Sequence, residues 1–152
     1  MKNYTLRLNL AINKINIAYL ASINNESISE AELCFMYALD DDKSHSQKEI
    51  CHDWLIHKTT LNTIVKRYER KGLIVFTPIP GTRREMLITL TEKGKEYVKE
   101  KLDFIYRAEK KAIKQTIEQY DENFISALET YGLNLKLAFE EAEKKKNGLI
   151  KR

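Results

Sequence analysis

The sequence contains few of the residues that interrupt regular secondary structure. Its 152 residues include only two prolines and five glycines. Both prolines, Pro78 and Pro80, lie in one short segment, so long stretches on either side of it are free of strong helix breakers. We therefore expect a mainly helical protein with few turns.

Cysteine is equally scarce, and long apolar runs are missing. Two cysteines, Cys34 and Cys51, are too few for a disulfide framework in a chain of this size, which favours a reducing compartment. No apolar stretch approaches the length of a membrane span. Residues 1–20 are interrupted by Asn and Lys and lack a small-residue cleavage site, unlike a signal peptide. We expect a cytoplasmic protein with no membrane partner, built as one domain or as one domain with helical extensions.

Neither sign of charge is in strong excess. The chain has 26 Lys and Arg against 22 Asp and Glu, a formal net charge of +4 that does not by itself indicate a nucleic-acid partner. The location of the charge is more informative. Between His57 and Gly72 there are five basic residues and one acidic residue, so this segment alone carries an excess equal to that of the whole chain.

The residue combinations that catalysis or metal binding requires are also missing from the sequence. It has no Gly-rich phosphate loop, no Ser or Cys nucleophile placed with a His and a carboxylate, and no paired carboxylates in an expected cleft. Cys51, His52 and His57 form a loose group with His45 nearby, but Cys51 and His52 are adjacent and point to different sides of a helix. Their spacing is not that of a zinc site. We predict no catalytic residue, no cofactor and no metal site.

Apolar residues recur at helical spacing near the N-terminus, over residues 6–23. Two neighbouring rows make up the apolar surface: Leu8, Ile12, Ile15 and Tyr19 in one, and Leu6, Leu10, Ile17 and Leu20 in the other. A helix that is apolar over so much of its surface requires partners on more than one side. Asn24 and Asn25 are predicted to end it.

The middle of the chain predicts three helices. Ser29 with Glu32, and Ser46 with Glu49, form capping boxes, in which the Ser hydroxyl accepts from a free N–H while the Glu bonds back to the cap. The first of these helices is expected to end at residues 40–42. A third helix is predicted over residues 57–71, and it ends at Gly72, where a left-handed C-cap residue is needed.

The hydrophobic period then changes to that of a β-hairpin. Residues 73–76 and 86–90 are predicted strands, and the basic, turn-rich segment 77–85 joins them. Thr91 is a suitable N-cap for the helix that follows.

Two further helices are predicted after the hairpin, with a corner at residues 119–123. The apolar face of the first carries Val98, Leu102, Ile105 and Ala112. The second has a 4-3-4-3-4 spacing typical of a coiled-coil seam. That seam consists of Phe124, Leu128, Tyr131, Leu135, Ala138 and Ala142. The chain is expected to fray from residues 144–146 onward.

Three helices followed by a basic hairpin are the order of a winged helix-turn-helix. Small polar residues at the start of the third helix suit base edges in the major groove, and basic residues further along suit phosphates. Basic residues at the hairpin tip suit an adjacent minor groove or the DNA backbone. The predicted DNA contacts are Lys58, Thr59, Thr60, Asn62, Thr63, Lys66, Arg70, Arg83 and Arg84. The alternative is that the basic helix face is simply solvated, and the basic hairpin directly after it favours DNA.

Two segments resemble the MarR family of transcriptional regulators. Residues 46–76 are similar to the family's helix-turn-helix and first wing strand, and residues 82–98 to its second wing strand and the next helix. The most specific parts are ERKGLI at residues 69–74 and LTEKG at residues 90–94. The family's wing usually carries Asp-x-Arg. Arg84 matches that Arg, whereas Thr82 stands at the Asp position, so we expect Arg84 to be held differently.

The resemblance implies a homodimer that binds a pseudo-palindromic double-stranded DNA site. Residues 1–27 would be an N-terminal dimerisation helix, residues 28–100 the winged helix-turn-helix lobe, and residues 101–152 the helices that complete the dimerisation region. A competing arrangement, in which the first and last helices pack only on each other within one chain, stays open. The implied function is sequence-specific regulation of transcription, as a repressor relieved by an effector. The alternative is a winged-helix dimerisation or protein-interaction module that does not bind DNA.

Members of the family respond to small aromatic ligands, oxidants or metals. The family's sensing cysteine usually lies in the first helix, and residues 6–23 contain none, so Cys34 and Cys51 are expected to be buried and inert. A small-molecule effector would bind between the dimerisation helices and the DNA-binding lobe. Tyr19, Tyr37, Trp54 and Tyr106 are the candidate lining residues, although aromatic residues at helical spacing are equally typical of a core.

Overall fold

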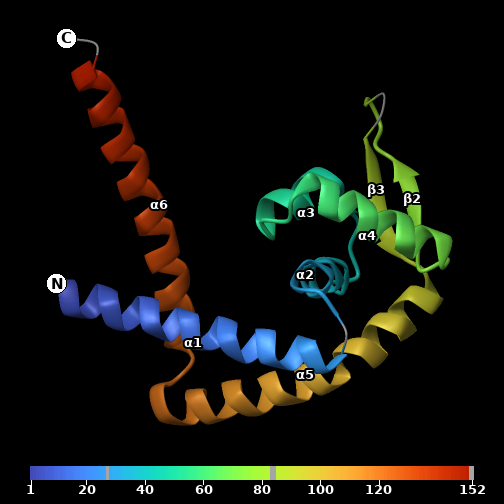
Figure 1. The fold of residues 1–152 in the computed structure, drawn as a ribbon, viewed down its shortest axis with the longest axis horizontal. Helices are drawn as coiled ribbons and strands as arrows, with labels where there is room; N and C mark the ends of the chain where they lie inside the picture. The colour runs from blue at the N-terminus through green and yellow to red at the C-terminus, as the bar shows by residue number, and fades with distance from the viewer. Residues whose placement is uncertain (27, 83–84, 151–152) are drawn as a thin grey trace. The chain divides into compact units, whose positions relative to one another are not determined.

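The computed structural model describes residues 1–26, 28–82 and 85–150 (Figure 1). Over these residues the chain forms six helices and three strands, which confirms the mainly helical class. They are α1 (Lys2–Glu26), α2 (Glu30–Leu39), β1 (His45–Ser46), α3 (Gln47–Asp53), α4 (Lys58–Arg70), β2 (Ile74–Pro78), β3 (Met86–Leu90), α5 (Glu92–Tyr120) and α6 (Asn123–Ile150). The chain divides into two compact units, residues 1–105 and 106–152.

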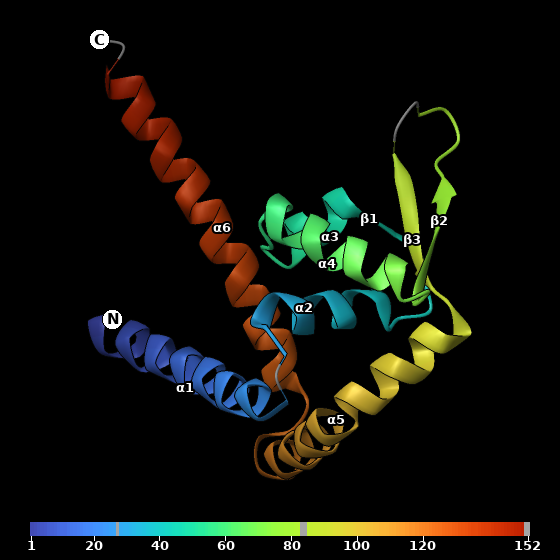
Figure 2. The same ribbon diagram turned by 45° about the vertical axis from the view of Figure 1, so that its right-hand side comes forward.

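The core of the first unit lies where α2, α3 and α4 meet the sheet and the start of α5 (Figure 2). Its most deeply buried side chains come from all of these elements: Phe35, Met36, Ile50, Leu61, Tyr68, Ile88, Val98 and Leu102. The predicted apolar face of α4 is confirmed, because Leu61, Ile64, Val65 and Tyr68 are all buried. The opposite face of α4 is therefore left toward solvent.

A small antiparallel sheet stands beside these helices in the order β1-β3-β2. Ile74 pairs with Leu90 and Phe76 with Ile88, so β2 and β3 form the predicted hairpin. The strand β3 has the predicted bounds, whereas β2 runs two residues past the predicted end, to Pro78. Proline is tolerated there because β2 is an edge strand. The strand β1 was not predicted, since two residues are too few to show an alternating pattern.

The end of α4 is fixed by a Schellman motif. Gly72 has a φ of +68°, in the left-handed region that glycine adopts without strain. Its N–H donates to the Glu69 carbonyl at 2.9 Å, and the Leu73 N–H donates to the Tyr68 carbonyl at 3.0 Å. These two bonds satisfy the last carbonyls of the helix, as the sequence predicted for Gly72.

The start of α5 is bonded to the same place, in what we call the α4–α5 junction. The Thr91 hydroxyl donates to the Gly72 carbonyl at 2.8 Å and accepts from the Gly94 N–H at 3.0 Å, which confirms Thr91 as an N-cap. Lys93 Nζ donates to the Lys71 carbonyl at 2.9 Å. A Cβ at residue 94 would collide with the Leu73 carbonyl, so only glycine fits. This geometry explains Thr91, Lys93 and Gly94 of the LTEKG sequence at residues 90–94.

The two predicted capping boxes differ. At α3 both bonds form: the Ser46 N–H donates to Glu49 Oε2 at 2.7 Å, and the Glu49 N–H donates to Ser46 Oγ at 3.2 Å. At α2 only the Glu32 N–H to Ser29 Oγ bond forms, at 3.2 Å. The second half of this predicted box was wrong, because the Glu32 carboxylate instead accepts from Tyr68 and pairs with Arg67.

Both terminal helices are longer than predicted. The helix α1 begins at Lys2 and continues through Asn24 and Asn25, and α6 continues to Ile150 instead of fraying at residues 144–146. Asn is an indifferent helix former, costing at most about 0.7 kcal/mol relative to Ala, so it does not by itself stop a helix. The corner is confirmed, since α5 ends at Tyr120 and α6 begins at Asn123.

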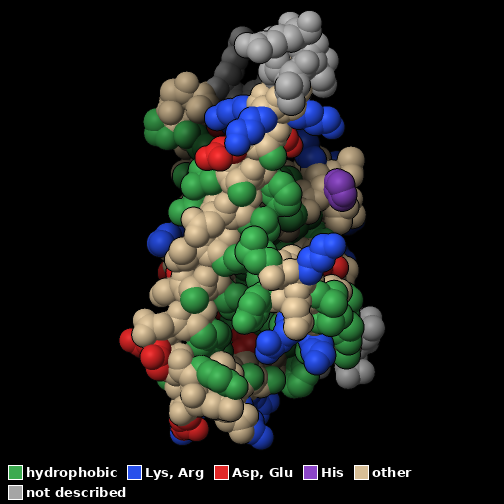
Figure 3. All heavy atoms as spheres, turned by 90° about the vertical axis from the view of Figure 1, so that its left-hand side faces the viewer, with side chains coloured by type: hydrophobic (Ala, Val, Ile, Leu, Met, Phe, Trp, Pro, Cys, Tyr) green, Lys and Arg blue, Asp and Glu red, His purple; other side chains and the backbone are tan. Residues whose placement is uncertain are grey.

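Apolar side chains are exposed on both terminal helices, and Figure 3 shows hydrophobic side chains in the open on one face of the molecule. On α1 we call them the α1 apolar set: Tyr4, Leu6, Leu10, Ile12, Ile15, Ile17 and Leu20. On α6 we call them the α6 apolar set: Ile125, Leu128, Leu133, Leu135, Leu137 and Phe139. None of the helices over the described residues is long and apolar enough to cross a membrane.

Candidate nucleic-acid interface

The exposed face of α4 carries the helix residues predicted to contact DNA. Lys58, Thr59 and Thr60 form its first turn and are exposed, as is Thr63, whose hydroxyl donates to the Thr59 carbonyl at 3.1 Å. Asn62 is half-buried beside them. The N-cap residue of α4 makes no side-chain capping bond, so the N–H groups of the first turn remain open to an acceptor. An anion at this end of a helix is favoured by the helix dipole.

The lysines of this face are free to meet phosphates. Lys58 and Lys66 are exposed, and over the described ranges neither lies within ion-pair distance of a carboxylate. Arg70 is also exposed, and its Nε donates to the Lys66 carbonyl at 3.3 Å. Charges that are not already paired inside a protein are the ones that can neutralise a nucleic-acid backbone.

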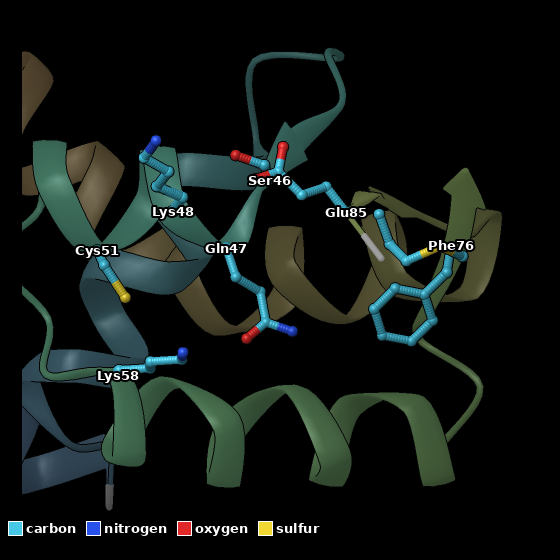
Figure 4. A pocket seen from close by; sticks show the side chains of 8 residues that line it. Ser46, Gln47, Lys48, Cys51, Lys58, Phe76 and Glu85 are labelled. Atoms are coloured by element: carbon cyan, nitrogen blue, oxygen red, sulfur yellow. The ribbon is translucent and has the colours of Figure 1, made fainter. Parts of the chain in front are cut away.

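A groove lies between this face and the hairpin. One hollow of about 490 Å³ is lined by Ser46, Gln47, Lys48, Cys51, Lys58, Phe76, Glu85 and Met86 (Figure 4). A second, of about 320 Å³, is lined by Gln47, Asn62, Val65, Lys66, Glu69, Phe76 and Met86. Because Gln47, Phe76 and Met86 line both, the two hollows form one groove beside α4.

Gln47 is one of several residues of this groove that the sequence analysis did not predict as part of the site. It is the first residue of α3, and its side chain points into the hollow from the side opposite Phe76 (Figure 4). The capping box places it immediately after the N-cap Ser46, where a side chain flanks the helix start. The position of Gln47 directly after the N-cap could have predicted its place in the groove, but the capping-box pattern involves only Ser46 and Glu49.

Arg67 has a different environment from the other basic residues of α4. Its Nη2 lies 2.6 Å from Oε2 of Glu32, which is buried. Although the sequence counts Arg67 among the five basic residues of this segment, its charge is already paired within the protein. The unpaired positive charge of the α4 face is therefore smaller than the sequence implies.

The hairpin tip is organised by Thr82. Its hydroxyl donates to the Ile79 carbonyl at 3.0 Å and lies 3.4 Å from the Glu85 carbonyl, and the Ile79 N–H donates to Glu85 at 3.1 Å. Thr82 thus bonds to the backbone of its own turn, at the position where the resembling family has Asp. The predicted contacts Arg83 and Arg84 lie outside the described residues.

Two of the predicted ligand-lining residues contact each other directly. The rings of Tyr37 and Trp54 stack in the first unit, with centroids 5.8 Å apart and planes 10° apart. Tyr19 is half-buried on α1, and Tyr106 belongs to the second unit.

The two cysteines are half-buried rather than fully buried. Burial, and then the charge of Glu30, raise the pKa of the Cys34 thiol, which favours its protonated form. Cys51 lines the groove beside α4. His45 lies 2.8 Å from Asp41, and His52 lies 2.7 Å from Asp53. Over the described residues no group of three potential metal ligands converges.

Comparison with solved structures identifies the architecture. NMB1585, a MarR family regulator from Neisseria meningitidis, superimposes with a TM-score of 0.71 at 21% identity, covering 92% of this chain and 96% of that one. The protein has the MarR fold. The same MarR fold is present in S. aureus MepR in its complex with DNA, with a TM-score of 0.58 at 19% identity, covering 87% of this chain and 97% of that one.

Sequence comparison gives a shorter match. No family model matches the sequence. Over 68 residues, which are 45% of this chain, it is 35% identical to the HTH-type transcriptional repressor NicR of Pseudomonas putida. The matched stretch spans 41% of that relative's length. The predicted winged-helix architecture of the MarR fold is thus confirmed over nearly the whole chain by structure, and the similarity in sequence is confined to less than half of it.

Proposed function

We propose that this protein is a sequence-specific double-stranded DNA-binding regulator of transcription. The observation that carries the proposal is the exposed face of α4, whose unpaired Lys58 and Lys66 border the groove that continues to the hairpin. The likeness in fold to MepR, solved as a complex with DNA, and the partial match to a transcriptional repressor support it.

In this proposal α4 enters the major groove, which is about 12 Å wide and admits a helix. Thr59, Thr60, Asn62 and Thr63 contact base edges there. Lys58, Lys66 and Arg70 contact phosphates, which position the protein without reporting sequence. Arg83 and Arg84 contact the adjacent minor groove or its backbone.

The working form is proposed to be a homodimer. The α1 and α6 apolar sets are exposed, and uncovered apolar surface of this extent indicates an interaction site. Residues 1–27 and 101–152 would form the dimerisation region, and residues 28–100 the DNA-binding lobe. A two-fold dimer places its two α4 helices about one DNA turn apart, which fits a pseudo-palindromic site.

We further propose that DNA binding represses transcription by steric block and that a small molecule relieves it. The stacked Tyr37 and Trp54 are the candidate contacts for such an effector, together with Tyr19 and Tyr106. No catalytic turnover is part of the proposed function.

Selection of duplexes from a random DNA pool tests DNA binding directly. We expect the protein to enrich a pseudo-palindromic sequence and to bind it with an affinity that falls steeply with salt. Each phosphate contact releases condensed counterions, and this release is less favourable when the salt concentration is high. Replacing Arg84 with Ala should weaken binding severalfold or more. If no duplex is enriched at low salt, the proposal is wrong.

One double variant distinguishes the DNA-binding regulator from the alternative, an interaction module that does not bind DNA. Lys66→Ala with Arg84→Ala should abolish the cellular effect of the protein, since both side chains are assigned to DNA. Lys99→Ala, an exposed lysine on α5, is the matched control and should leave the effect intact. An unchanged cellular effect in the double variant would favour the interaction module.

A further inference from the structure

Glu32 is a carboxylate in an unusual place. It lies in the first turn of α2 and is only 7% exposed, and it is one of two buried polar residues in the described part of the chain. A carboxylate at this position of a capping box normally bonds back to the cap residue, as Glu49 does in α3. The Glu32 carboxylate reaches across to α4 instead.

Both oxygens of this carboxylate are engaged by consecutive residues of α4. The Tyr68 hydroxyl donates to Oε1 at 3.0 Å, and Nη2 of Arg67 lies 2.6 Å from Oε2. A short, charge-assisted contact of this kind is stronger and more directional than a neutral hydrogen bond. Two contacts from adjacent residues to one carboxylate restrict both the rotation of α4 about its axis and its shift along that axis.

Neighbouring side chains also hold Tyr68 and Arg67 in place. The Tyr68 ring packs edge-on against Phe35 of α2, with centroids 5.0 Å apart, and edge-on against Tyr97 of α5 at 5.8 Å. Burial, followed by the charge of Glu32, raises the pKa of Tyr68, so its hydroxyl remains a donor. The Arg67 guanidinium also lies over the Tyr68 ring, 6.0 Å from its centroid.

Arg67 differs from its neighbour Lys66 in its exposure and in the partner of its charge. Lys66 is exposed and lines the groove, whereas Arg67 is half-buried and its charge is directed to Glu32. Arg67 Nε is buried and lacks a hydrogen-bond partner in the described part of the chain. An ion pair with one buried partner, such as Glu32, adds little stability compared with apolar side chains of the same size, but it can specify one arrangement over others.

We propose that Glu32 is a positioning residue for DNA recognition, which acts through Arg67 and Tyr68 to set the orientation of α4 in the major groove. This inference rests on the proposed DNA-binding function. Base contacts require the side chains of α4 to be placed accurately, whereas contacts to phosphates tolerate small rotations. The contacts of Glu32 with Arg67 and Tyr68 should therefore affect the selectivity between DNA sequences more than the general affinity for DNA.

The test compares two duplexes, one enriched from the random pool by the wild-type protein and one of scrambled sequence. Glu32→Gln keeps the shape of the side chain and an acceptor for Tyr68 but removes the charge opposite Arg67. We expect its Kd for the enriched duplex to rise by about five- to tenfold, which corresponds to the loss of one good polar interaction. Its Kd for the scrambled duplex should change by less than about twofold.

Arg67→Met and Lys66→Met form a matched pair on adjacent residues. Arg67→Met should raise the Kd for the enriched duplex as much as Glu32→Gln does. The double variant Glu32→Gln/Arg67→Met should lose no more affinity than either single variant, because both substitutions remove the same interaction. Neither should change the slope of log K against log salt. Lys66→Met should reduce that slope by about 0.9 on both duplexes, as expected for one lost phosphate contact.

Two outcomes would overturn the inference and leave the proposed function intact. One is a reduced salt slope in Arg67→Met, which would make Arg67 a phosphate contact. The other is a lower urea midpoint in Glu32→Gln with an unchanged Kd for the enriched duplex, which would make the pair purely structural. If Glu32→Gln does not fold, Arg67→Lys serves instead, since it keeps the charge but not the planar geometry. Failure of the wild-type protein to enrich any duplex would instead refute the proposed function, and this inference with it.

Discussion

Leu55 has a backbone conformation that residues with a Cβ rarely adopt. It lies between α3 and α4 with a φ of +51°, and its side chain is 88% exposed, so no burial compensates for the strain. Left-handed geometry costs an L-residue about 1–2 kcal/mol, and the greater flexibility of unfolded glycine offsets part of any gain. We expect Leu55→Gly to raise the free energy of unfolding by about 0.5 kcal/mol in urea titrations.

Gly72→Ala is the matched control for this prediction. Gly72 has a φ of +68° with nothing near the position of a Cβ, so the substitution adds strain without a collision. It should lower the free energy of unfolding by about 1 kcal/mol. A loss of stability in Leu55→Gly would show that the α3–α4 turn is not strained.

Gly94 is required because the Leu73 backbone lies too close for a Cβ, and not because its φ is positive. A Cβ there meets the Leu73 carbonyl, which belongs to the backbone and is bonded to the Thr91 N–H at 3.0 Å, so it cannot move aside cheaply. Gly94→Ala should lower the free energy of unfolding by about 2–3 kcal/mol, as overpacking does elsewhere. Glu96→Ala, on the exposed side of the same helix, should stay within about 0.5 kcal/mol of the wild type. Similar urea midpoints for the two variants would contradict the packing argument.

At the scale of elements, the capping box of α3 is expected to make a pH-dependent contribution to the stability of the fold. The Ser46 backbone N–H, and then its hydroxyl, lower the pKa of Glu49 from its ordinary value. A carboxyl whose pKa is lower in the folded state stabilises the fold above its unfolded pKa of about 4.3, and that contribution is lost as the pH falls through the folded value.

We therefore expect Glu49→Gln to be less stable than the wild type at pH 7, with a difference that narrows below about pH 4. Urea unfolding followed by circular dichroism at several pH values measures this difference. A difference that stays constant down to pH 3 would mean that the charge of Glu49 has no part in the cap.

Elements with a repeated pattern were predictable from the sequence. The apolar face of α4, the Gly72 cap and the bounds of β3 follow from local periodicity and from one special residue. The strand β1 was not predictable, because its two residues form a strand only by pairing with β3.

The same distinction holds within the candidate site. The exposed residues of α4 follow from its helical period. The local pattern assigns Glu32 to a cap and Arg67 to the basic face, whereas the two residues meet only when α2 packs on α4. Contacts between residues so far apart in sequence have no local signature.

At the scale of the whole molecule, the proposed dimer makes a direct prediction. The substitutions Leu10→Glu and Ile17→Glu place two charges within the α1 apolar set, where the side chains are 51% and 64% exposed. Burying these charges in an interface without partners is costly. We expect the double variant to sediment as a monomer under conditions where the wild type sediments as a dimer.

Lys14→Glu is the control, since it adds negative charge to the same helix at a residue outside the α1 apolar set. It should leave the dimer intact. A wild-type protein that remains monomeric at micromolar concentration would exclude the proposed assembly, and it would favour packing of the terminal helices within one chain.

The α4–α5 junction has a consequence for how this architecture tolerates change. The hydrogen bond from Thr91 to Gly72 ties together the two ends of the hairpin, so the backbone between them forms a closed loop. Lengthening a loop whose ends are already held costs little, about 0.6 kcal/mol for each doubling. Insertions beside Gly81 should therefore leave the helices undisturbed. The hairpin is in this sense an exchangeable part, whose length can change while α4 keeps its place in the lobe.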